Sequence, residues 1–172
     1  MTLHIAPDAI EEAAKLLYIR ALKILPDDIK QGFSRIVASE TDATAQSILA
    51  TMVENIGVAE RTENLLCQDT GIPIFNVQIG RDVALDGWAL KQALTRGTAR
   101  ATREHPLRSS VVHPITRRNE HTSCGAHVPV IHIDFVDQPE ILRIEMIPKG
   151  SGSENGSSTQ VTPRSAGGSP AR

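Results

Sequence analysis

The sequence has few aromatic residues and no long apolar run, and each scarcity excludes a class of protein. Its 172 residues include one Trp, one Tyr and three Phe, so a core must rest on Ile, Leu, Val and Ala. No apolar run approaches the roughly 20 residues that a membrane-spanning helix needs. The start, MTLHIAPDAIEEAAK, lacks the basic and apolar pattern of a secretory signal. We therefore expect a cytoplasmic globular protein with no membrane partner.

An excess of either charge is also missing. The chain has 18 Lys and Arg against 20 Asp and Glu, a formal net charge of -2. Proteins that bind nucleic acid through its phosphates usually present a clustered basic face. Because the two charge signs are mixed along this chain, we expect no nucleic-acid partner.

Cysteine is scarce, with only Cys67 and Cys124 in the sequence. A protein that is not exported stays in a reducing compartment, where thiols persist and disulfides are rare. Each thiol could then bind a metal, act as a nucleophile or simply be buried. The residues alone leave these three roles open.

Helical periodicity dominates the first third of the chain. Apolar residues recur at three- and four-residue steps from residue 10 onwards, which predicts a first helix that ends at Pro26. A second helix is predicted over residues 27–39. A third is predicted to begin near Thr41 or Asp42 and to end at Gly57.

Strand patterns appear after residue 64. Alternating apolar residues predict a strand over 72–79, with Pro73 at its beginning or at a sheet edge. A helix is predicted over 85–104, followed by strands over 127–136 and 141–147. Because only a short turn separates the last two strands, we expect them to pair as an antiparallel hairpin.

These elements predict an α+β fold: an N-terminal helical layer, then a small, mostly antiparallel sheet with a crossing helix. The end of the chain differs in composition. Residues 156–172 are rich in Gly and Ser and cannot bury enough apolar surface to offset the entropy of ordering them. We expect an N-terminal domain over 1–155 and a disordered tail over 156–172.

Three short motifs carry residues suited to chemistry. CQDTG places Cys67 and Asp69 at a chain reversal, where both can face a cleft; a capping turn with a buried thiol is the alternative. HPLRSSVVHP places Arg108 beyond a helix-ending proline. A guanidinium can bind a carboxylate through two parallel hydrogen bonds, although a solvated arginine is the commoner case. KGSGSEN has glycines that let the backbone approach an anion, with a flexible linker as the alternative.

A zinc site is a further possibility that the spacing raises. His121, Cys124 and His127 lie three residues apart, as metal ligands on one helix face would. The stretch HTSCGAHVP contains Gly and Pro, however, and is typical of a loop. A fourth ligand with characteristic spacing is also lacking, so we do not expect structural zinc.

Taken in order, the motifs CQDTG, HPLRSSVV, VPVIHIDFV and KGSGSEN resemble those of the class I fumarase family, whose relatives include the α subunit of L-tartrate dehydratase. The resemblance covers about residues 65–155. It implies a hydro-lyase that reversibly adds water to fumarate to give malate, using a [4Fe–4S] cluster held by three cysteines. An L-tartrate dehydratase α subunit, or a non-catalytic subunit that binds dicarboxylates, is the alternative.

The resemblance also implies roles for single residues. Cys67 matches the first cluster ligand. The positions that would contact the small dicarboxylate substrate are Gln68, Asp69, Arg108, Gly150, Ser151 and Gly152. No motif present identifies the catalytic base. The expected partner is a second copy, giving a homodimer, or a β subunit.

The chain departs from the family pattern near its end. Two of the three expected cysteine ligands are missing, because Cys124 lies where relatives usually carry a small or polar residue. The segment after Asn155 does not resemble the family. We therefore expect the N-terminal part of a truncated or frame-shifted member, inactive on its own.

Overall fold

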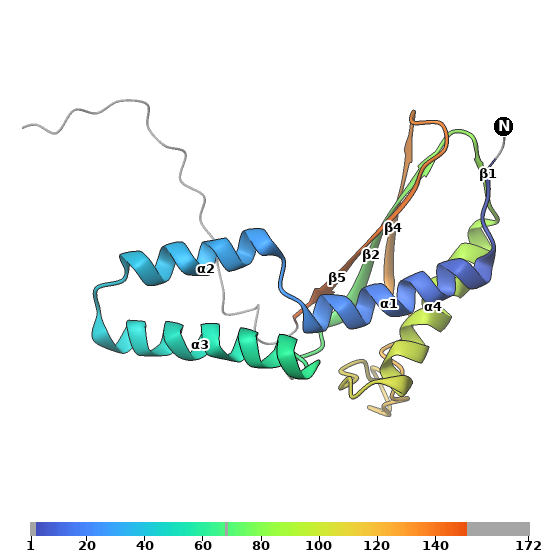
Figure 1. The fold of residues 1–172 in the computed structure, drawn as a ribbon. Helices are drawn as coiled ribbons and strands as arrows, with labels where there is room; N and C mark the ends of the chain where they lie inside the picture. Colours follow the sequence, from blue (N-terminus) through green and yellow to red (C-terminus); the bar gives the residue numbers. More distant parts are fainter. Residues whose placement is uncertain (1–2, 68, 151–172) are drawn as a thin grey trace, which may run out of the picture.

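A small sheet with two helices packed against it forms the body of the molecule (Figure 1). The computed structural model describes residues 3–67 and 69–150. In chain order its elements are β1 (Leu3–His4), α1 (Pro7–Lys23), α2 (Asp27–Ser39), α3 (Ala43–Thr62), β2 (Ile72–Gly80), β3 (Val83–Ala84), α4 (Gly87–Glu104), β4 (Val130–Val136) and β5 (Leu142–Lys149). The predicted α+β class is confirmed.

The core lies between one face of the sheet and the helices α1 and α4. Side chains of β2 alternate between the two faces, and Phe75, Val77 and Ile79 are buried on the face toward the helices. Ile10 and Ala14 of α1 pack into the same cluster, together with the apolar side of α4. Burial of aliphatic side chains therefore holds the helices to the sheet.

The strand order is β4-β2-β5, so β2 is central. It pairs in parallel with β4 and antiparallel with β5. The predicted hairpin over 127–147 is wrong, because β4 and β5 lie on opposite sides of β2. Pro73 lies near the start of a central strand rather than at an edge, opposite Pro148.

The connection between β4 and β5 passes over the end of β2 at Gly80. A side chain at Gly80 would meet the carbonyl oxygens of Gln138 and Pro139. The Gly80 amide donates to the Ile141 carbonyl at 2.7 Å. Since glycine has no Cβ, the chain can cross here and place β5 beyond β2 instead of beside β4.

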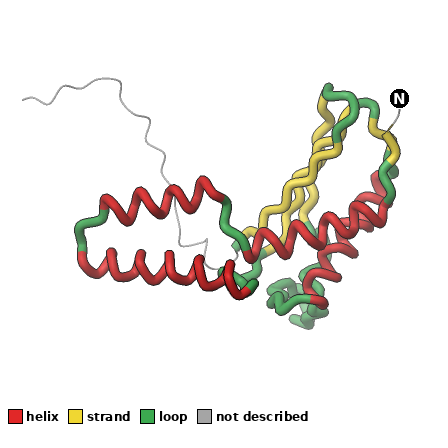
Figure 2. Tube along the Cα trace, in the orientation of Figure 1, coloured by secondary structure: helices red, strands yellow, loops and turns green. Residues whose placement is uncertain are grey.

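The helices α2 and α3 form a hairpin that projects from the body (Figures 1 and 2). Asp42 caps α3 by accepting from the Ala45 amide at 2.9 Å. The predicted end of this helix at Gly57 is wrong: α3 ends at Thr62, and the capping residue Glu63 that follows has a left-handed φ of 54°. One interior glycine costs a helix only about 1 kcal/mol, which the neighbouring turns can offset. Along 3–67 and 69–150, no helix is long and apolar enough to cross a membrane.

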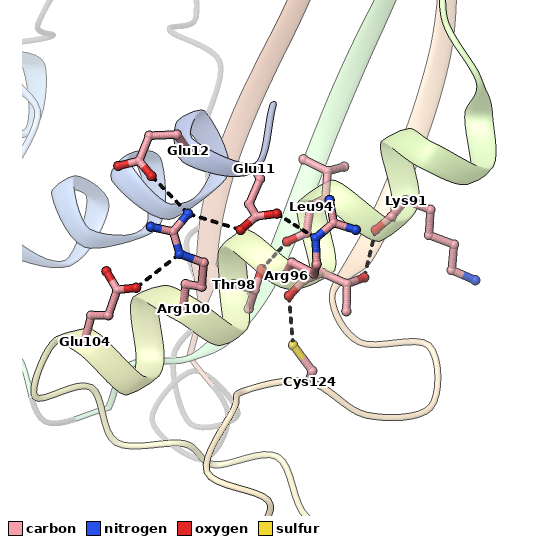
Figure 3. Close-up of polar contacts among 10 residues, drawn as sticks. Glu11, Glu12, Lys91, Leu94, Arg96, Thr98, Arg100, Glu104 and Cys124 are labelled. Carbon is pink, nitrogen blue, oxygen red and sulfur yellow. Dashed lines mark hydrogen bonds and ion pairs between the residues drawn. The ribbon is translucent and has the colours of Figure 1, made fainter. Parts of the chain in front are cut away.

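An ion-pair cluster on one side joins α1 to α4 (Figure 3). Arg96 Nε donates to Glu11 Oε2 at 2.6 Å, and Arg100 Nη1 donates to Glu11 Oε1 at 3.1 Å. The Glu11 side chain is only 15% exposed. Hydrogen bonds from Arg96 and Arg100 hold the pKa of the Glu11 carboxyl below its usual value, against the opposite effect of burial.

This pairing predicts a pH-dependent effect of Glu11→Gln. A depressed folded-state pKa means that the carboxylate stabilises the fold above its unfolded value of 4.5 and that this contribution is lost as the pH falls through the lower, folded value. At pH 7 we expect Glu11→Gln to lower the free energy of unfolding by about 1–2 kcal/mol, measured by urea unfolding. The difference should shrink as the pH is lowered from 4.5.

The control is Glu54→Gln, since Glu54 is exposed on α3. We expect Glu54→Gln to change the free energy of unfolding little, both at pH 7 and below pH 4.5. Equal effects of the two substitutions at pH 7 would show that the Glu11 pairs contribute no net stability.

Candidate functional site

The CQDTG motif forms a loop between α3 and β2. Its Gln68 lies outside the described residues. The Asp69 amide donates to Cys67 Sγ at 3.4 Å, and the Gly71 amide donates to Asp69 Oδ1 at 3.2 Å. Asp69 thus makes the local backbone bond expected of a capping turn. The Cys67 thiol, however, is exposed rather than buried, and so remains accessible to a ligand.

Thr70 connects this loop to the HPLRSSVVHP motif. The Thr70 side chain is fully buried. Its hydroxyl donates to the Arg108 carbonyl oxygen. The two motifs lie 38 residues apart in the chain, yet this bond places the Arg108 backbone directly beside the CQDTG loop. The Arg108 residue itself is exposed.

Gly71 connects the same loop to the end of β5. It has a φ of 70°, and a Cβ there would lie 2.7 Å from the Lys149 carbonyl oxygen. Ile72, the next residue, pairs with Lys149 in the sheet. Any side chain at Gly71 would therefore push away the first residue of the KGSGSEN motif. Gly150 is described and buried, whereas Ser151 and Gly152 lie outside the described residues.

Three motifs that the sequence singled out thus meet at one end of the sheet. The loop with Cys67 and Asp69 bonds to the Arg108 backbone through Thr70 and lies against Lys149 at Gly71. This placement brings a thiol, a carboxylate and a guanidinium-bearing segment to a common edge. The roles of these residues toward a substrate stay predictions.

Cys124 lies against α4. Its Sγ donates to the Thr95 carbonyl oxygen at 3.5 Å (Figure 3). Burial raises the pKa of the Cys124 thiol to about 11. A thiol held in its protonated form and bonded to backbone is a poor metal ligand, because the thiolate is the ligating form.

The donor set along 3–67 and 69–150 does not fit an iron–sulfur cluster. Such clusters are held by several cysteine thiolates. Within this part of the chain, no group of three or more His, Cys, Asp or Glu side chains is placed to hold a metal ion. Cys67 could supply one thiolate, whereas the Cys124 thiol donates to the Thr95 carbonyl oxygen.

Sequence reasoning missed Tyr18, which contacts the CQDTG loop. Its hydroxyl donates to the Thr70 carbonyl oxygen at 3.2 Å. A signal was available, because Ile10, Ala14 and Leu22 share a four-residue spacing with Tyr18 on the buried side of α1. A phenol at a core position needs a hydrogen-bond partner, which predicts a polar contact there but not which one.

Comparison with known proteins identifies the family. The family described as Fumarate hydratase (Fumerase) matches this chain over residues 11–169, which include all the motifs. The chain belongs to this family. The match extends to residue 169, so the expectation that the segment after Asn155 does not resemble the family is wrong. The domain boundary predicted at residue 155 stays a prediction. Fumarate hydratases are hydro-lyases, and the family membership therefore places the chain among proteins of that chemistry.

Individual relatives are named for two hydro-lyase activities. A Methanocaldococcus jannaschii protein provisionally named L(+)-tartrate dehydratase subunit alpha is 36% identical over 161 residues, 92% of this chain and 56% of the relative. A Geobacillus stearothermophilus protein provisionally named fumarate hydratase class I is 27% identical over 149 residues, 86% of this chain and 28% of the relative. L(+)-tartrate dehydratase subunit alpha of Escherichia coli (strain UTI89) is 30% identical over 128 residues, 74% of this chain and 42% of the relative.

This chain thus spans about half the length, or less, of the curated relatives that it matches. The activity of a whole family member therefore does not pass to these residues by similarity alone.

The two thiols are predicted to differ in reactivity. Because Cys67 is exposed and the pKa of Cys124 is raised to about 11, iodoacetamide at pH 8 should modify Cys67 at least about tenfold faster than Cys124 in the folded protein. The Cys124 rate should climb as the pH approaches 11, since the thiolate is the nucleophile. Peptide mass spectrometry measures both rates, and in urea the two should converge. Similar rates in the folded protein would contradict the placement of Cys124 against α4.

Proposed function

We propose that this chain forms part of a hydro-lyase that reversibly adds water across the double bond of fumarate to give malate. In this proposal it supplies the surface that contacts the dicarboxylate, together with one thiolate, Cys67. The observation that carries the proposal is the meeting of Cys67, Asp69, Arg108 and Gly150 segments at one end of the sheet. Membership of the fumarate hydratase family supports the reaction class.

Arg108 has the clearest chemical task in this proposal. A guanidinium binds a carboxylate through two parallel hydrogen bonds, which fixes orientation as well as position. Holding one end of a dicarboxylate would align its double bond with the rest of the site, and alignment lowers the entropic part of the barrier. Asp69, held by the Gly71 amide, presents its carboxylate at the same edge.

The cluster expected from the family resemblance is not supported by this chain's own donors. Only Cys67 offers an exposed thiol in the described residues. A [4Fe–4S] cluster would therefore need further thiolates from another part of the whole protein or from a partner. What these residues can do is bind and orient the substrate. In this proposal the protein acts in the cytoplasm.

A second candidate is the α subunit of an L-tartrate dehydratase. The relatives from M. jannaschii and E. coli carry that name, which supports this candidate as strongly as the first. Tartrate and fumarate are both four-carbon dicarboxylates, so a site built on Arg108 suits either. In this case the partner would be a β subunit, whereas the fumarate reaction is also compatible with a homodimer.

Calorimetry with fumarate, L-malate and L-tartrate tests the binding role of Arg108. Loss of a charge-assisted pair is worth about 1.5–3 kcal/mol, so Arg108→Ala should weaken dicarboxylate binding by about tenfold or more. The control is Arg81→Ala, because Arg81 is exposed at the opposite end of β2 and pairs with Asp137 at 2.5 Å. Equal affinity in wild type and Arg108→Ala would remove Arg108 from the site. The ranking of the three ligands would separate the two candidate functions.

Anaerobic reconstitution with iron and sulfide tests whether the chain suffices alone. With one suitable thiol we expect no stable cluster by absorption spectroscopy and no hydration of fumarate. Cys67→Ser is the matched control and should give the same null result. A stable cluster with hydratase activity in the wild-type chain would overturn the inference that further thiolates are required.

A further inference from the structure

The Tyr18 side chain reaches from α1 to the backbone of the candidate site. Tyr18 is fully buried. Its hydroxyl donates to the Thr70 carbonyl oxygen at 3.2 Å and lies 3.5 Å from the carbonyl oxygen of Gly71. The two acceptors stand 52 and 53 residues away in the chain, so the contact is purely tertiary.

The surroundings of the ring fix this hydroxyl in place. The phenol packs in a buried cluster with Ile19, Leu22, Ala101 and Leu107. Burial raises the pKa of the Tyr18 phenol, and the side chains of Ser123 and Thr70 only partly oppose this effect. The group is therefore a protonated, rigidly held donor at any ordinary pH.

The loop that it contacts is held by different elements from different sides. Tyr18 holds the Thr70 carbonyl, the Arg108 backbone accepts from the Thr70 hydroxyl, and Gly71 lies against Lys149. Within the loop, the Asp69 amide donates to Cys67 Sγ and the Gly71 amide donates to Asp69 Oδ1. The contacts of Thr70 and Gly71 with Tyr18, Arg108 and Lys149 therefore join the loop that carries the Cys67 thiol and the Asp69 carboxylate to the rest of the fold.

We propose that Tyr18 is a positioning residue: by holding the Thr70 carbonyl, its hydroxyl sets where Cys67 and Asp69 lie relative to Arg108. The ligand in question rests on the proposed function, whereas the anchoring itself rests on the geometry alone. Loss of the hydroxyl leaves the fold in place and loosens the loop, because the ring remains to fill the core. A dicarboxylate that needs both Asp69 and Arg108 then binds a less ordered site.

The test compares Tyr18→Phe with the matched variant Thr98→Val in the full chain. Thr98 is also fully buried, and its hydroxyl donates to the Leu94 carbonyl at 2.9 Å, within α4. Each substitution removes one buried hydroxyl bonded to a carbonyl. Three quantities are measured: the urea midpoint, amide hydrogen exchange at Asp69 and Gly71 with Gly80 as the internal reference, and L-malate affinity by calorimetry.

Both variants should lower the urea midpoint by similar amounts. Only Tyr18→Phe should speed exchange at Asp69 and Gly71, by about fivefold to tenfold, with Gly80 unchanged. Only Tyr18→Phe should weaken L-malate binding. Unchanged exchange at both amides, or equal acceleration by Thr98→Val, overturns the proposal. Unchanged L-malate affinity in Tyr18→Phe also overturns it, since the loop would then not need this anchor.

A spectroscopic arm avoids any dependence on how well the variants fold. Tyr18 is the only tyrosine in the chain, so 3-fluorotyrosine labels this position alone. Its fluorine resonance should shift when L-malate binds, and a fixed resonance despite measured binding overturns the positioning role. If the wild-type chain binds none of L-malate, fumarate or L-tartrate, the proposed dicarboxylate-binding function of the chain fails. The exchange data then still decide whether Tyr18 anchors the loop.

Discussion

The backbone of β2 forms hydrogen bonds with β4 on one side and with β5 on the other. The position of the candidate site follows from this central place of β2 in the sheet. Parallel pairing aligns the start of β4 with the start of β2, and antiparallel pairing brings the end of β5 to the same place. The CQDTG loop enters the sheet there and the KGSGSEN motif leaves it. A parallel pair needs a crossover connection, which α4 and the loop after it provide. That loop carries Arg108. Three distant motifs therefore come together because one strand is central.

Much of the fold follows from local patterns. Proline at the ends of helices and alternation in strands place α1, α2, α4 and all three long strands within a few residues of their observed bounds. Local patterns did not predict which strands pair with each other. Asp137–Glu140 has the length of a hairpin turn, yet the strand pairing and the contact of this connection with Gly80 show that it crosses over the end of β2. Strand order depends on which edges are free after the chain has folded, and no single segment carries that information.

The residues of the candidate site show the same difference between what the sequence predicts and what only the fold reveals. Side chains with recognisable chemistry, Cys67, Asp69 and Arg108, stand out in the sequence because their neighbours are unusual for a core. The residues that position them do not. Tyr18 and Thr70 each make a bond to a backbone carbonyl, and such a bond has no characteristic spacing in the sequence. The two cysteines show the same limit, since only the fold separates an exposed thiol from one held against Thr95.

The projecting hairpin has a consequence for cooperativity. No residue of α2 is buried, and Ala59 is the only buried residue of α3. Ile36 and Ile48 are both more than half exposed. Near the body, Lys30 joins α2 to α3 by pairing with Glu60 at 2.7 Å. Asn55 donates to the Leu66 carbonyl, and the Leu66 amide donates to the Leu22 carbonyl of α1, which ties the hairpin to the body. Farther from the body, separation of α2 from α3 would expose little additional apolar surface to water. The outer part of the hairpin is thus an arm that can open and reclose at low free-energy cost while the sheet keeps its end, and the loops gathered there, in place.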